Sequence, residues 1–391
     1  MKTISRTEIL DEIQQNSNVN FVAYVITPWH AISLNALLLF YRSKGIRLQG
    51  IVLIYPHNET GIHLSEKDFA MDGVEVYSTF DWGGVYTKDD MGEMTFFTKK
   101  LHNLKKKVQF YYHAILGGVN IKRKQNFYLM APVFPMVGIG AEILKLNKHI
   151  KYVALDEGVG TYLDNMEETF PTIRSIRDIK CLKNYWRDIV VTNHILPICH
   201  KMQNAYLFYR KKTCYVNQEI APFYRQALAS HVNHCQLDID LTNSIVICTS
   251  VVFNNIFQNQ EDVRMWTCLC NKLYFAGYNL VLKPHPRDTF FAGFADSWHC
   301  KLLNTNLSME DICTHTHPLA IFSIHSTTLI TVSALWGIST FCVADLFNKT
   351  NVNDNFIEEV NKYKNLFATL ISFPTDLDDC IKQLNNITHE K

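Results

Sequence analysis

The stretch NFVAYVITPWHAISLNALLLFYRSKGIRLQGIVLIY, residues 20–55, decides the fold class of this chain. Its two ends, residues 20–26 and 48–55, are short apolar runs typical of buried strands. Residues 30–44 between them predict a helix that begins shortly after Thr27 and Pro28. A strand, a helix and a second strand in this order predict a parallel sheet.

The same alternation continues to the end of the chain. We expect strands at 74–77, 126–130 and 150–155, a helix at 138–146, and a second series that opens at residue 243. The predicted strands of that series are 244–248, 278–282, 319–324 and 340–344, the predicted helices are 260–277 and 327–336, and a helical tail follows at 354–385. The pattern predicts an α/β protein with two facing Rossmann-like domains, residues 1–225 and 226–391, joined around residues 216–243. Ligands are expected in a deep cleft between them, at the carboxyl ends of the strands.

Composition narrows the class of protein. The 391 residues are 47% hydrophobic, 12% aromatic and 19% charged, which excludes a mainly disordered chain. Lysine and arginine number 38 against 37 acidic residues, so a nucleic-acid partner is not expected. A basic segment, Lys99–Lys124, surrounds Tyr111 and Tyr112. It is either a solvated surface or a patch for an anionic acceptor or for anionic lipid headgroups.

Targeting signals and cysteines suggest a cytoplasmic protein. The N-terminal residues lack the apolar core and cleavage site of a signal peptide. The most apolar stretch, Phe21–Tyr41, is interrupted by polar residues and a proline, so a spanning helix is not expected. All 11 cysteines fall between Cys181 and Cys380, several within apolar runs, which favours buried reduced thiols.

The first of three polar signatures is Asp156-Glu157-Gly158, directly after the predicted strand 150–155. Successive side chains at a strand end point to opposite sides, so one carboxylate can face the cleft while the other makes structural hydrogen bonds. A carboxylate aimed at an acceptor hydroxyl is a suitable general base. The alternative is a simple turn or helix cap, because Asp and Gly are common turn formers.

The second signature, Lys283-Pro284-His285-Pro286-Arg287, follows the strand 278–282. Two prolines fix the backbone around His285, and Lys283 and Arg287 make the local field positive. This grouping suits a phosphate, to which the histidine can donate, or a leaving group that it can protonate. The alternative is a rigid turn with an exposed histidine. A second His-Pro pair, His317-Pro318, precedes a strand and is expected to be structural.

The third signature, Ser326-Thr327-Thr328, opens the predicted helix 327–336 after His325. Hydroxyl groups and free backbone N–H groups at the positive end of a helix dipole form an anion site. N-capping by Ser326 or Thr327 is the simpler reading, and the two roles are compatible.

Other motifs are missing or weak. The chain has no GxxxxGK[ST], GxGxxG, GxSxG or HExxH motif, which argues against NTPase, dehydrogenase, serine hydrolase and zincin functions. Asp238-Ile-Asp240 has the spacing of a metal-binding DxD motif but lies in the predicted linker, where it is expected to be solvated.

The three signatures together resemble the motifs of bacterial sialyltransferases of GT-B fold, of the lipooligosaccharide and capsular polysialyltransferase type. Asp156-Glu157-Gly158 resembles their acidic motif, His285-Pro286 their His-Pro motif, and two of Ser326, Thr327 and Thr328 their paired hydroxyl motif. The order and spacing match over roughly residues 20–345.

This resemblance implies a GT-B glycosyltransferase that moves sialic acid from CMP-sialic acid to a glycan hydroxyl, with inversion and without a metal or cofactor. It implies that Glu157 is the general base, with Asp156 as the other catalytic acid, and that His285 assists departure of CMP. Donor contacts would come from Ser326, Thr327, Thr328, Lys283, Pro286 and Arg287, and the acceptor side from Thr27, His30 and Gly158.

The expected acceptor is a glycan of a surface oligosaccharide or capsule, neutral or anionic, and peripheral contact with the inner membrane is one alternative. Related folds use CMP-Kdo or CDP-glycerol, which remain alternative donors. A further alternative is a non-enzymatic protein that binds an anionic polymer.

Overall fold

The computed structural model describes residues 1–4, 6–54, 64–69, 71–78, 127–132, 151–156, 158–163, 206–210, 212–232, 240–249, 260–285, 288, 290–347 and 354–389. Contacts divide the chain into a first unit, Met1–Glu157 with Asp164–Tyr206, and a second unit, Gly158–Leu163 with Leu207–Lys391. The short segment Gly158–Leu163 therefore packs within the second unit, although its neighbours in sequence belong to the first.

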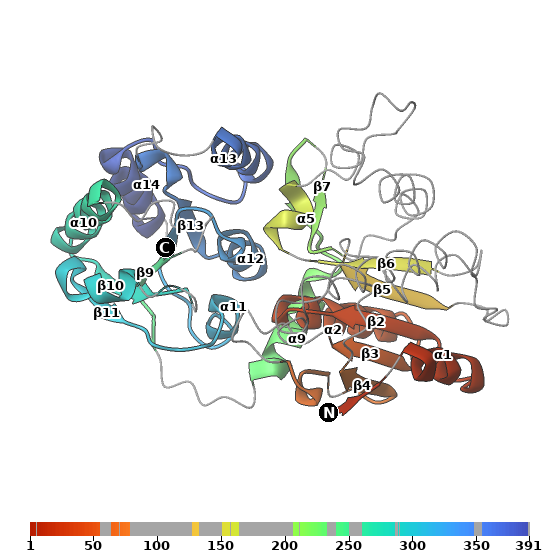
Figure 1. Cartoon of the computed structure of the whole chain (residues 1–391). Coiled ribbons are helices and arrows are strands. Elements are labelled where there is room, and N and C mark those ends of the chain that lie inside the picture. Colours follow the sequence, from red (N-terminus) through yellow and green to blue (C-terminus); the bar gives the residue numbers. More distant parts are fainter. Residues whose placement is uncertain are drawn as a thin grey trace, which may run out of the picture. The chain divides into compact units, whose positions relative to one another are not determined.

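The first unit is built on a six-stranded parallel sheet with the strand order β1-β4-β3-β2-β5-β6 (Figure 1). Its strands are β1 (Lys2–Thr3), β2 (Phe21–Val25), β3 (Gly50–Ile54), β4 (Val74–Ser78), β5 (Tyr128–Pro132) and β6 (Lys151–Leu155), and its described helices are α1 (Arg6–Gln15), α2 (Pro28–Ser43) and the 3-10 helix η2 (Glu66–Phe69). Every residue of β2 and β3 is buried, in keeping with the unbroken apolar runs that buried parallel strands show.

The second unit holds a five-stranded parallel sheet with the order β11-β10-β9-β12-β13. The strands are β9 (Ser244–Cys248), β10 (Asn279–Lys283), β11 (Cys300–Leu302), β12 (Ala320–Ser323) and β13 (Ser339–Cys342). The second unit also contains a separate two-stranded antiparallel sheet, formed by β7 (Phe208–Arg210) and β8 (Cys214–Val216). The α-helices are α5 (Val159–Leu163), α9 (Ala221–Val232), α10 (Gln260–Phe275), α11 (Met309–Ile312), α12 (Thr327–Trp336), α13 (Asp354–Phe367) and α14 (Leu377–His389), and the 3-10 helices are η7 (Phe291–Phe294), η8 (Asp296–Trp298) and η9 (Ala344–Leu346).

The strand order of the second sheet creates a topological switch point. Strand β9 comes first along the chain, and its neighbours are β10 on one side and β12 on the other. The carboxyl ends of β10, β9 and β12 therefore share one edge of the sheet. In parallel α/β proteins the crevice at such a point is where ligands bind, because the connections leave the sheet there in opposite directions.

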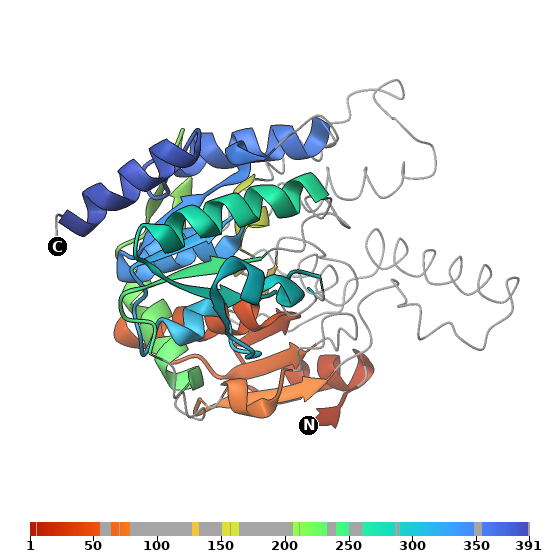
Figure 2. The same cartoon turned by 90° about the vertical axis from the view of Figure 1, so that its left-hand side faces the viewer.

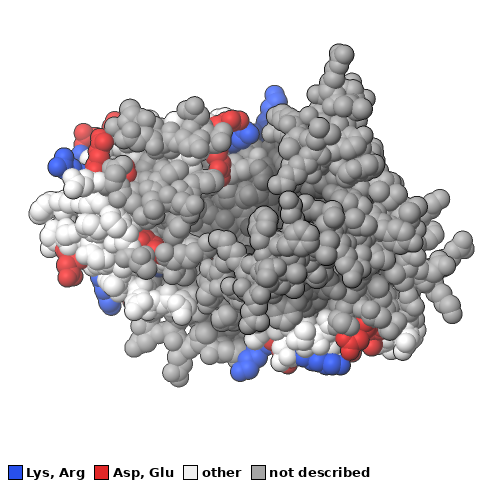
Figure 3. All heavy atoms as spheres, in the orientation of Figure 1, with Lys and Arg blue, Asp and Glu red and all other residues white. Residues whose placement is uncertain are grey.

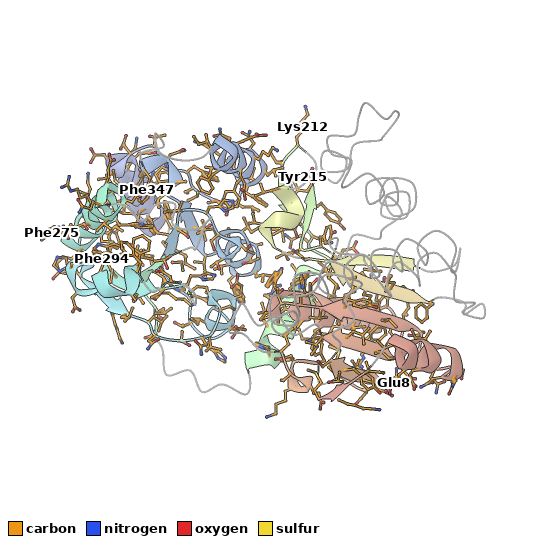
Figure 4. All side chains as sticks on the ribbon, in the orientation of Figure 1. Glu8, Lys212, Tyr215, Phe275, Phe294 and Phe347 are labelled. Atoms are coloured by element: carbon orange, nitrogen blue, oxygen red, sulfur yellow. The ribbon has the colours of Figure 1, made fainter. Side chains whose placement is uncertain are left out.

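An aromatic cluster fills one side of the second unit. Trp266 and Trp298 are almost completely buried, with ring centroids 5.9 Å apart. Phe294 stacks on Trp298 and Phe347 packs edge-on against Trp266, whereas Phe275 is 79% exposed (Figure 4). Helices α10 and α14 lie side by side over this unit (Figure 2). This cluster anchors α10 and η8 to the sheet by burial of large apolar surface.

Charged side chains of the described residues do not form a single-sign patch on the face shown in Figure 3, where lysine and arginine lie interspersed with acidic residues. No helix among the described residues is both long and apolar enough to span a bilayer. The basic segment Lys99–Lys124 lies outside the described residues.

The α/β class is confirmed, with one Rossmann-like parallel sheet in each unit. Strands were expected at every position where β2 to β6, β9, β10, β12 and β13 occur, and α2, α10, α12, α13 and α14 match expected helical segments. The helix expected at 138–146 lies outside the described residues, and the facing arrangement and the cleft stay predictions.

Helix α9 lies within the segment 216–243, where the two domains were expected to join. This helix has buried apolar residues, among them Tyr224, Ala227 and Leu228, and it packs against α11 and α12 of the second unit. The expected division between residues 225 and 226 falls within α9, whereas the contact units part at residues 206 and 207. Strand β11 and the β7–β8 pair were not predicted.

Candidate functional site

The acidic signature begins in the first unit, where β6 ends. Asp156 is 1% exposed, and its backbone N–H donates a hydrogen bond of 2.9 Å to Oγ of Ser33 on α2. Ser33 is itself completely buried, so this bond ties the end of β6 to the helix that follows β2. The burial of Asp156 is compatible with the expectation that one carboxylate of the pair makes structural hydrogen bonds. Glu157, the expected base, lies outside the described residues.

Gly158 makes the turn that leads into α5, and it does so in a conformation that favours glycine. Its φ is +92°. A Cβ at this position would lie 2.7 Å from Oγ1 and 2.8 Å from Cγ2 of Thr327. The next residue, Val159, donates its backbone N–H to Oγ1 of Thr327 over 3.1 Å. The structure therefore brings the glycine of the acidic signature against the hydroxyl signature, since Gly158 and Thr327 both belong to the second unit.

The hydroxyl signature occupies the start of α12. Ser326 is the N-cap, and its Oγ accepts a hydrogen bond of 3.2 Å from the backbone N–H of Thr328. In the bonds just described, Ser326 and Thr327 act as acceptors, so their hydroxyl protons remain available for donation. With the positive end of the α12 dipole behind them, partly exposed Ser326, Thr327 and Thr328 form a set of donors suited to an anion.

The residue before this signature, His325, is buried and faces α13 rather than the start of α12. Its ring contacts the rings of Tyr363 and Phe356, and burial lowers its pKa to about 4. The Tyr363 hydroxyl donates to the backbone oxygen of Ser326 over 2.9 Å. Helix α13 therefore fixes the loop between β12 and α12.

The His-Pro signature leaves the end of β10. The backbone N–H of His285 donates to Oγ1 of Thr249 over 2.9 Å, and the N–H of Thr249 donates to the carbonyl oxygen of Lys283 over 3.3 Å. Thr249 follows β9, so these two bonds join the ends of neighbouring strands. Pro286 and Arg287 lie outside the described residues.

Lys283 is the last residue of β10 and is only 6% exposed. The described residues provide its ammonium group with neither a hydrogen bond nor an ion pair. Burial of a cation is costly, and an anionic ligand would add to the compensation that the charge of nearby Glu310 can give. The geometry thus places a cation, a histidine and the start of α12 at the carboxyl edge of β10, β9 and β12.

Two residues of this edge were not found by sequence reasoning. Thr249 is the hydroxyl residue directly after β9, and its place at a strand end was the available signal. Glu310 on α11 is buried within reach of the Lys283 charge, and nothing in its local sequence marks it.

Thr27 and His30 cap α2 in the first unit. The Thr27 hydroxyl oxygen accepts from the His30 backbone N–H over 3.3 Å. In return, Nδ1 of His30 accepts from the backbone N–H groups of Ile26 and Thr27 over 3.3 and 3.2 Å. Burial lowers the pKa of His30 to about 3, so its ring is neutral. These contacts give both residues a role in the helix start.

The described residues contain no cluster of three or more histidine, cysteine, aspartate or glutamate side chains arranged to hold a metal ion. All eight cysteines in the described segments are free thiols. Asp240 of the DxD sequence accepts hydrogen bonds from the Thr242 backbone and the Thr316 hydroxyl, whereas Asp238 lies outside the described residues.

A cavity of about 670 Å³ in the second unit lies at the opposite edge of the sheet, near the amino ends of β9 and β10. It is lined by Ser244, Asn279, His299 and Lys301 among others, and it contains none of the predicted site residues. Since ligands of parallel α/β sheets bind at the carboxyl ends, we assign the candidate site to the signatures and not to this cavity.

The profile of the family described as alpha-2,8-polysialyltransferase (POLYST) matches residues 21–345. A comparison with curated protein sequences gives no match.

Solved structures similar to the chain include a sialyltransferase from Photobacterium damsela, with 11% identity, TM-score 0.44, and coverage of 91% of this chain and 81% of that one. An alpha/beta-galactoside alpha-2,3-sialyltransferase from Photobacterium phosphoreum has 11% identity, TM-score 0.42 and coverage of 93% and 100%. A UDP-GlcNAc 2-epimerase from Neisseria meningitidis has 9% identity, TM-score 0.48 and coverage of 94% and 91%.

Proposed function

Because the chain belongs to the alpha-2,8-polysialyltransferase family, we propose that it transfers sialic acid from CMP-sialic acid to a hydroxyl group of a glycan acceptor. It is a glycosyltransferase, and its two α/β units agree with the GT-B architecture expected of such an enzyme. The observation that supports the finer proposal is the contact of Gly158 and Val159 with Thr327, because these residues follow Glu157 directly in sequence and Thr327 belongs to the hydroxyl signature.

The phosphate of the donor would bind at the edge formed by β10, β9 and β12. Hydroxyl protons of Ser326, Thr327 and Thr328 would donate to phosphate oxygens, and Lys283 would supply positive charge. The start of α12 is held in place by the Val159 bond to Thr327 and by the hydrogen bond from the Tyr363 hydroxyl to the backbone oxygen of Ser326. Preorganised donors of this kind stabilise charge that develops on the leaving group.

The acceptor would be activated by Glu157. This residue is bonded directly to Gly158, whose turn lies against Thr327. In the proposed reaction the acceptor oxygen attacks the anomeric carbon of sialic acid, its proton passes to the Glu157 carboxylate, and the bond from that carbon to the CMP oxygen breaks. Attack opposite the leaving group inverts the anomeric centre.

His285 would assist the departure of CMP. Its backbone is fixed by Thr249 and by the bond of 2.7 Å from the Asp288 N–H to its carbonyl oxygen. The imidazole would donate a hydrogen bond or a proton to the leaving phosphate oxygen, which carries the developing negative charge. No step requires a metal, so we propose metal-independent chemistry. The remaining donor and acceptor assignments, including Arg287, Pro286, Thr27 and His30, belong to the same proposal.

CMP-Kdo and CDP-glycerol are the second candidate donors, because the Lys283 and His285 grouping suits any phosphate-linked group. A thermal-shift comparison of CMP-sialic acid, CMP-Kdo, CDP-glycerol and UDP-sugars separates them. Stabilisation by CMP-sialic acid above the others is expected, by mass action on the folded state. Stabilisation by CDP-glycerol alone would contradict a sialyl donor.

Activity is tested by release of CMP from CMP-sialic acid in the presence of a galactoside or oligosialoside acceptor. Glu157→Gln is expected to remove turnover while leaving donor binding in place. His285→Ala is expected to lower kcat/KM by at least about 30-fold, or about 2 kcal/mol of transition-state stabilisation. EDTA is expected to have little effect, and strong inhibition by EDTA would refute the metal-independent mechanism.

The chain offers a matched control in its second His-Pro pair. His317 is exposed and Pro318 is bridged to Thr242, so the pair precedes β12 at the edge away from the signatures. His317→Ala is expected to keep the activity of the wild type. Equal losses in His285→Ala and His317→Ala would remove His285 from the mechanism.

A further inference from the structure

Glu310 is a buried carboxyl group that the proposed mechanism does not use. It lies on α11, is 6% exposed, and its Oε1 is 2.5 Å from Oγ1 of Thr331, in the second turn of α12. Thr331 is also buried, and the same hydroxyl lies 3.1 Å from the carbonyl oxygen of Thr327 and 3.3 Å from that of Thr328. A single hydroxyl therefore connects Glu310 to the backbone of two residues of the hydroxyl signature.

The Thr331 hydroxyl cannot donate to all of its neighbouring oxygen atoms at once. The Thr331 hydroxyl has one proton and three oxygen atoms within hydrogen-bond distance. If Glu310 is ionised, that proton goes to the carboxylate, and the carbonyl of Thr327 loses it. If Glu310 is protonated, it donates to Oγ1 of Thr331, which then donates to the carbonyl of Thr327. The protonation state of Glu310 therefore sets the hydrogen bonding in the first turn of α12.

Effects of both signs act on the pKa of Glu310, and their net result is a raised pKa. Burial raises its pKa above the usual range, and the neighbouring Asp311 acts in the same direction. The hydrogen bond from Thr331 and the charge of Lys283 lower it. Asp311 is itself paired with His231 of α9 at 3.0 Å. The thiols of Cys248, at the end of β9, and Cys313, after α11, also face this group, and burial raises the pKa of both, so they are uncharged near neutral pH.

Lys283 acts electrostatically on Glu310 and also belongs to the proposed phosphate site. A phosphate bound there would pair with its ammonium group and so weaken the effect of the Lys283 charge on Glu310. A phosphate there also brings negative charge toward Glu310, and both effects favour the neutral carboxyl group.

We propose that Glu310 is a positioning residue that takes up one proton from solvent when a donor phosphate binds at Lys283 and the start of α12. The protonated Glu310 then donates to Thr331, and Thr331 donates to the carbonyl of Thr327, so the hydroxyl signature is fixed when the donor is present. This inference rests on the proposed function only in taking Lys283 and α12 as the phosphate site.

Proton uptake is measured by calorimetric titration of CMP into the protein in buffers with different ionisation enthalpies, near neutral pH. Glu310→Gln keeps the shape of the side chain and a hydrogen bond to Thr331, and thermal unfolding checks that it folds. The variant is expected to take up fewer protons than the wild type, by up to one per CMP bound. The titration of the CMP phosphate is common to both proteins and cancels in the difference.

Affinity gives a second readout. The wild type is expected to lose CMP affinity by up to tenfold per pH unit more than Glu310→Gln as pH rises through the range of uptake, by linkage. The control is Glu358→Gln, whose side chain is exposed on α13 in an i,i+4 pair with Lys362 and should match the wild type. Equal proton counts and equal pH slopes for the wild type and Glu310→Gln would overturn the proposal.

The outcomes separate the two proposals. A wild type that binds no CMP would refute the cytidine donor, and the proton count of Glu310 is then measured with inorganic phosphate as the probe. A difference between the wild type and Glu310→Gln with that probe would support the role of Glu310, and no difference would overturn it.

Discussion

An alanine at position 158 meets two separate obstacles in the turn before α5. The first is the backbone, since φ is +92° and a left-handed conformation costs a residue with a Cβ about 1–2 kcal/mol. The second is Thr327, whose Oγ1 and Cγ2 would be 2.7 and 2.8 Å from the new methyl carbon, well inside van der Waals contact. Moving Thr327 away loses the hydrogen bond from Val159, worth about 1 kcal/mol. Gly158→Ala is therefore expected to destabilise the second unit by about 2–3 kcal/mol.

The assay is urea unfolding followed by tryptophan fluorescence, to which buried Trp266 and Trp298 of the second unit contribute. Gly160→Ala is the matched control, because nothing lies within 4 Å of its added Cβ and the residue is exposed in α5. In a helix this change is expected to stabilise by about 0.5–1 kcal/mol. Equal unfolding midpoints for the two alanine variants would refute the reasoning.

A double-mutant cycle separates the two obstacles. Thr327→Ala removes the two close atoms and leaves its Cβ 3.4 Å from the methyl group at position 158. In that background Gly158→Ala should cost the backbone part alone, about 1–2 kcal/mol. The same cost in both backgrounds would show that Gly158 and Thr327 are not in contact.

Three further results are expected. The pKa of His30 is lowered to about 3 and that of His325 to about 4. Below pH 6.5, the ordinary pKa of histidine, the unfolded state therefore binds more protons than the folded state. The free energy of unfolding should therefore fall as pH is lowered from about 6.5 to 4, and a flat profile of urea midpoints would contradict the buried neutral rings. Ser326→Ala removes the N-cap of α12 and should lower the free energy of unfolding by about 1 kcal/mol, whereas Ser326→Thr should retain most of it. Trp298→Ala should cost about 3–5 kcal/mol in the same assay, while exposed Phe275→Ala should stay within about 0.5 kcal/mol of the wild type.

Local sequence patterns determined most of the architecture. Unbroken apolar runs such as 21–25 and 244–248 are buried strands because a parallel sheet buries both faces of its central strands. Helix α12 begins directly after its N-cap Ser326, because the Ser326 hydroxyl oxygen accepts from a backbone N–H that has no partner within the helix. Helix α9 was not predicted, because a short amphipathic helix resembles a connecting segment until its packing against α11 and α12 is known.

The candidate site likewise combines features that local sequence predicts with contacts that depend on tertiary packing. Local sequence patterns predict that the acidic, histidine and hydroxyl signatures each follow a strand, since strand ends and turns depend on neighbouring residues. Folding of the whole unit is needed to bring Gly158 against Thr327, whose hydroxyl oxygen accepts a hydrogen bond from the N–H of Val159, 168 positions earlier in the sequence. The tertiary structure alone placed Thr249 beside His285 and buried Glu310 beneath α12. Such contacts depend on the order in which strands pair, and that order follows from packing of the whole sheet and not from the residues next to each other in sequence.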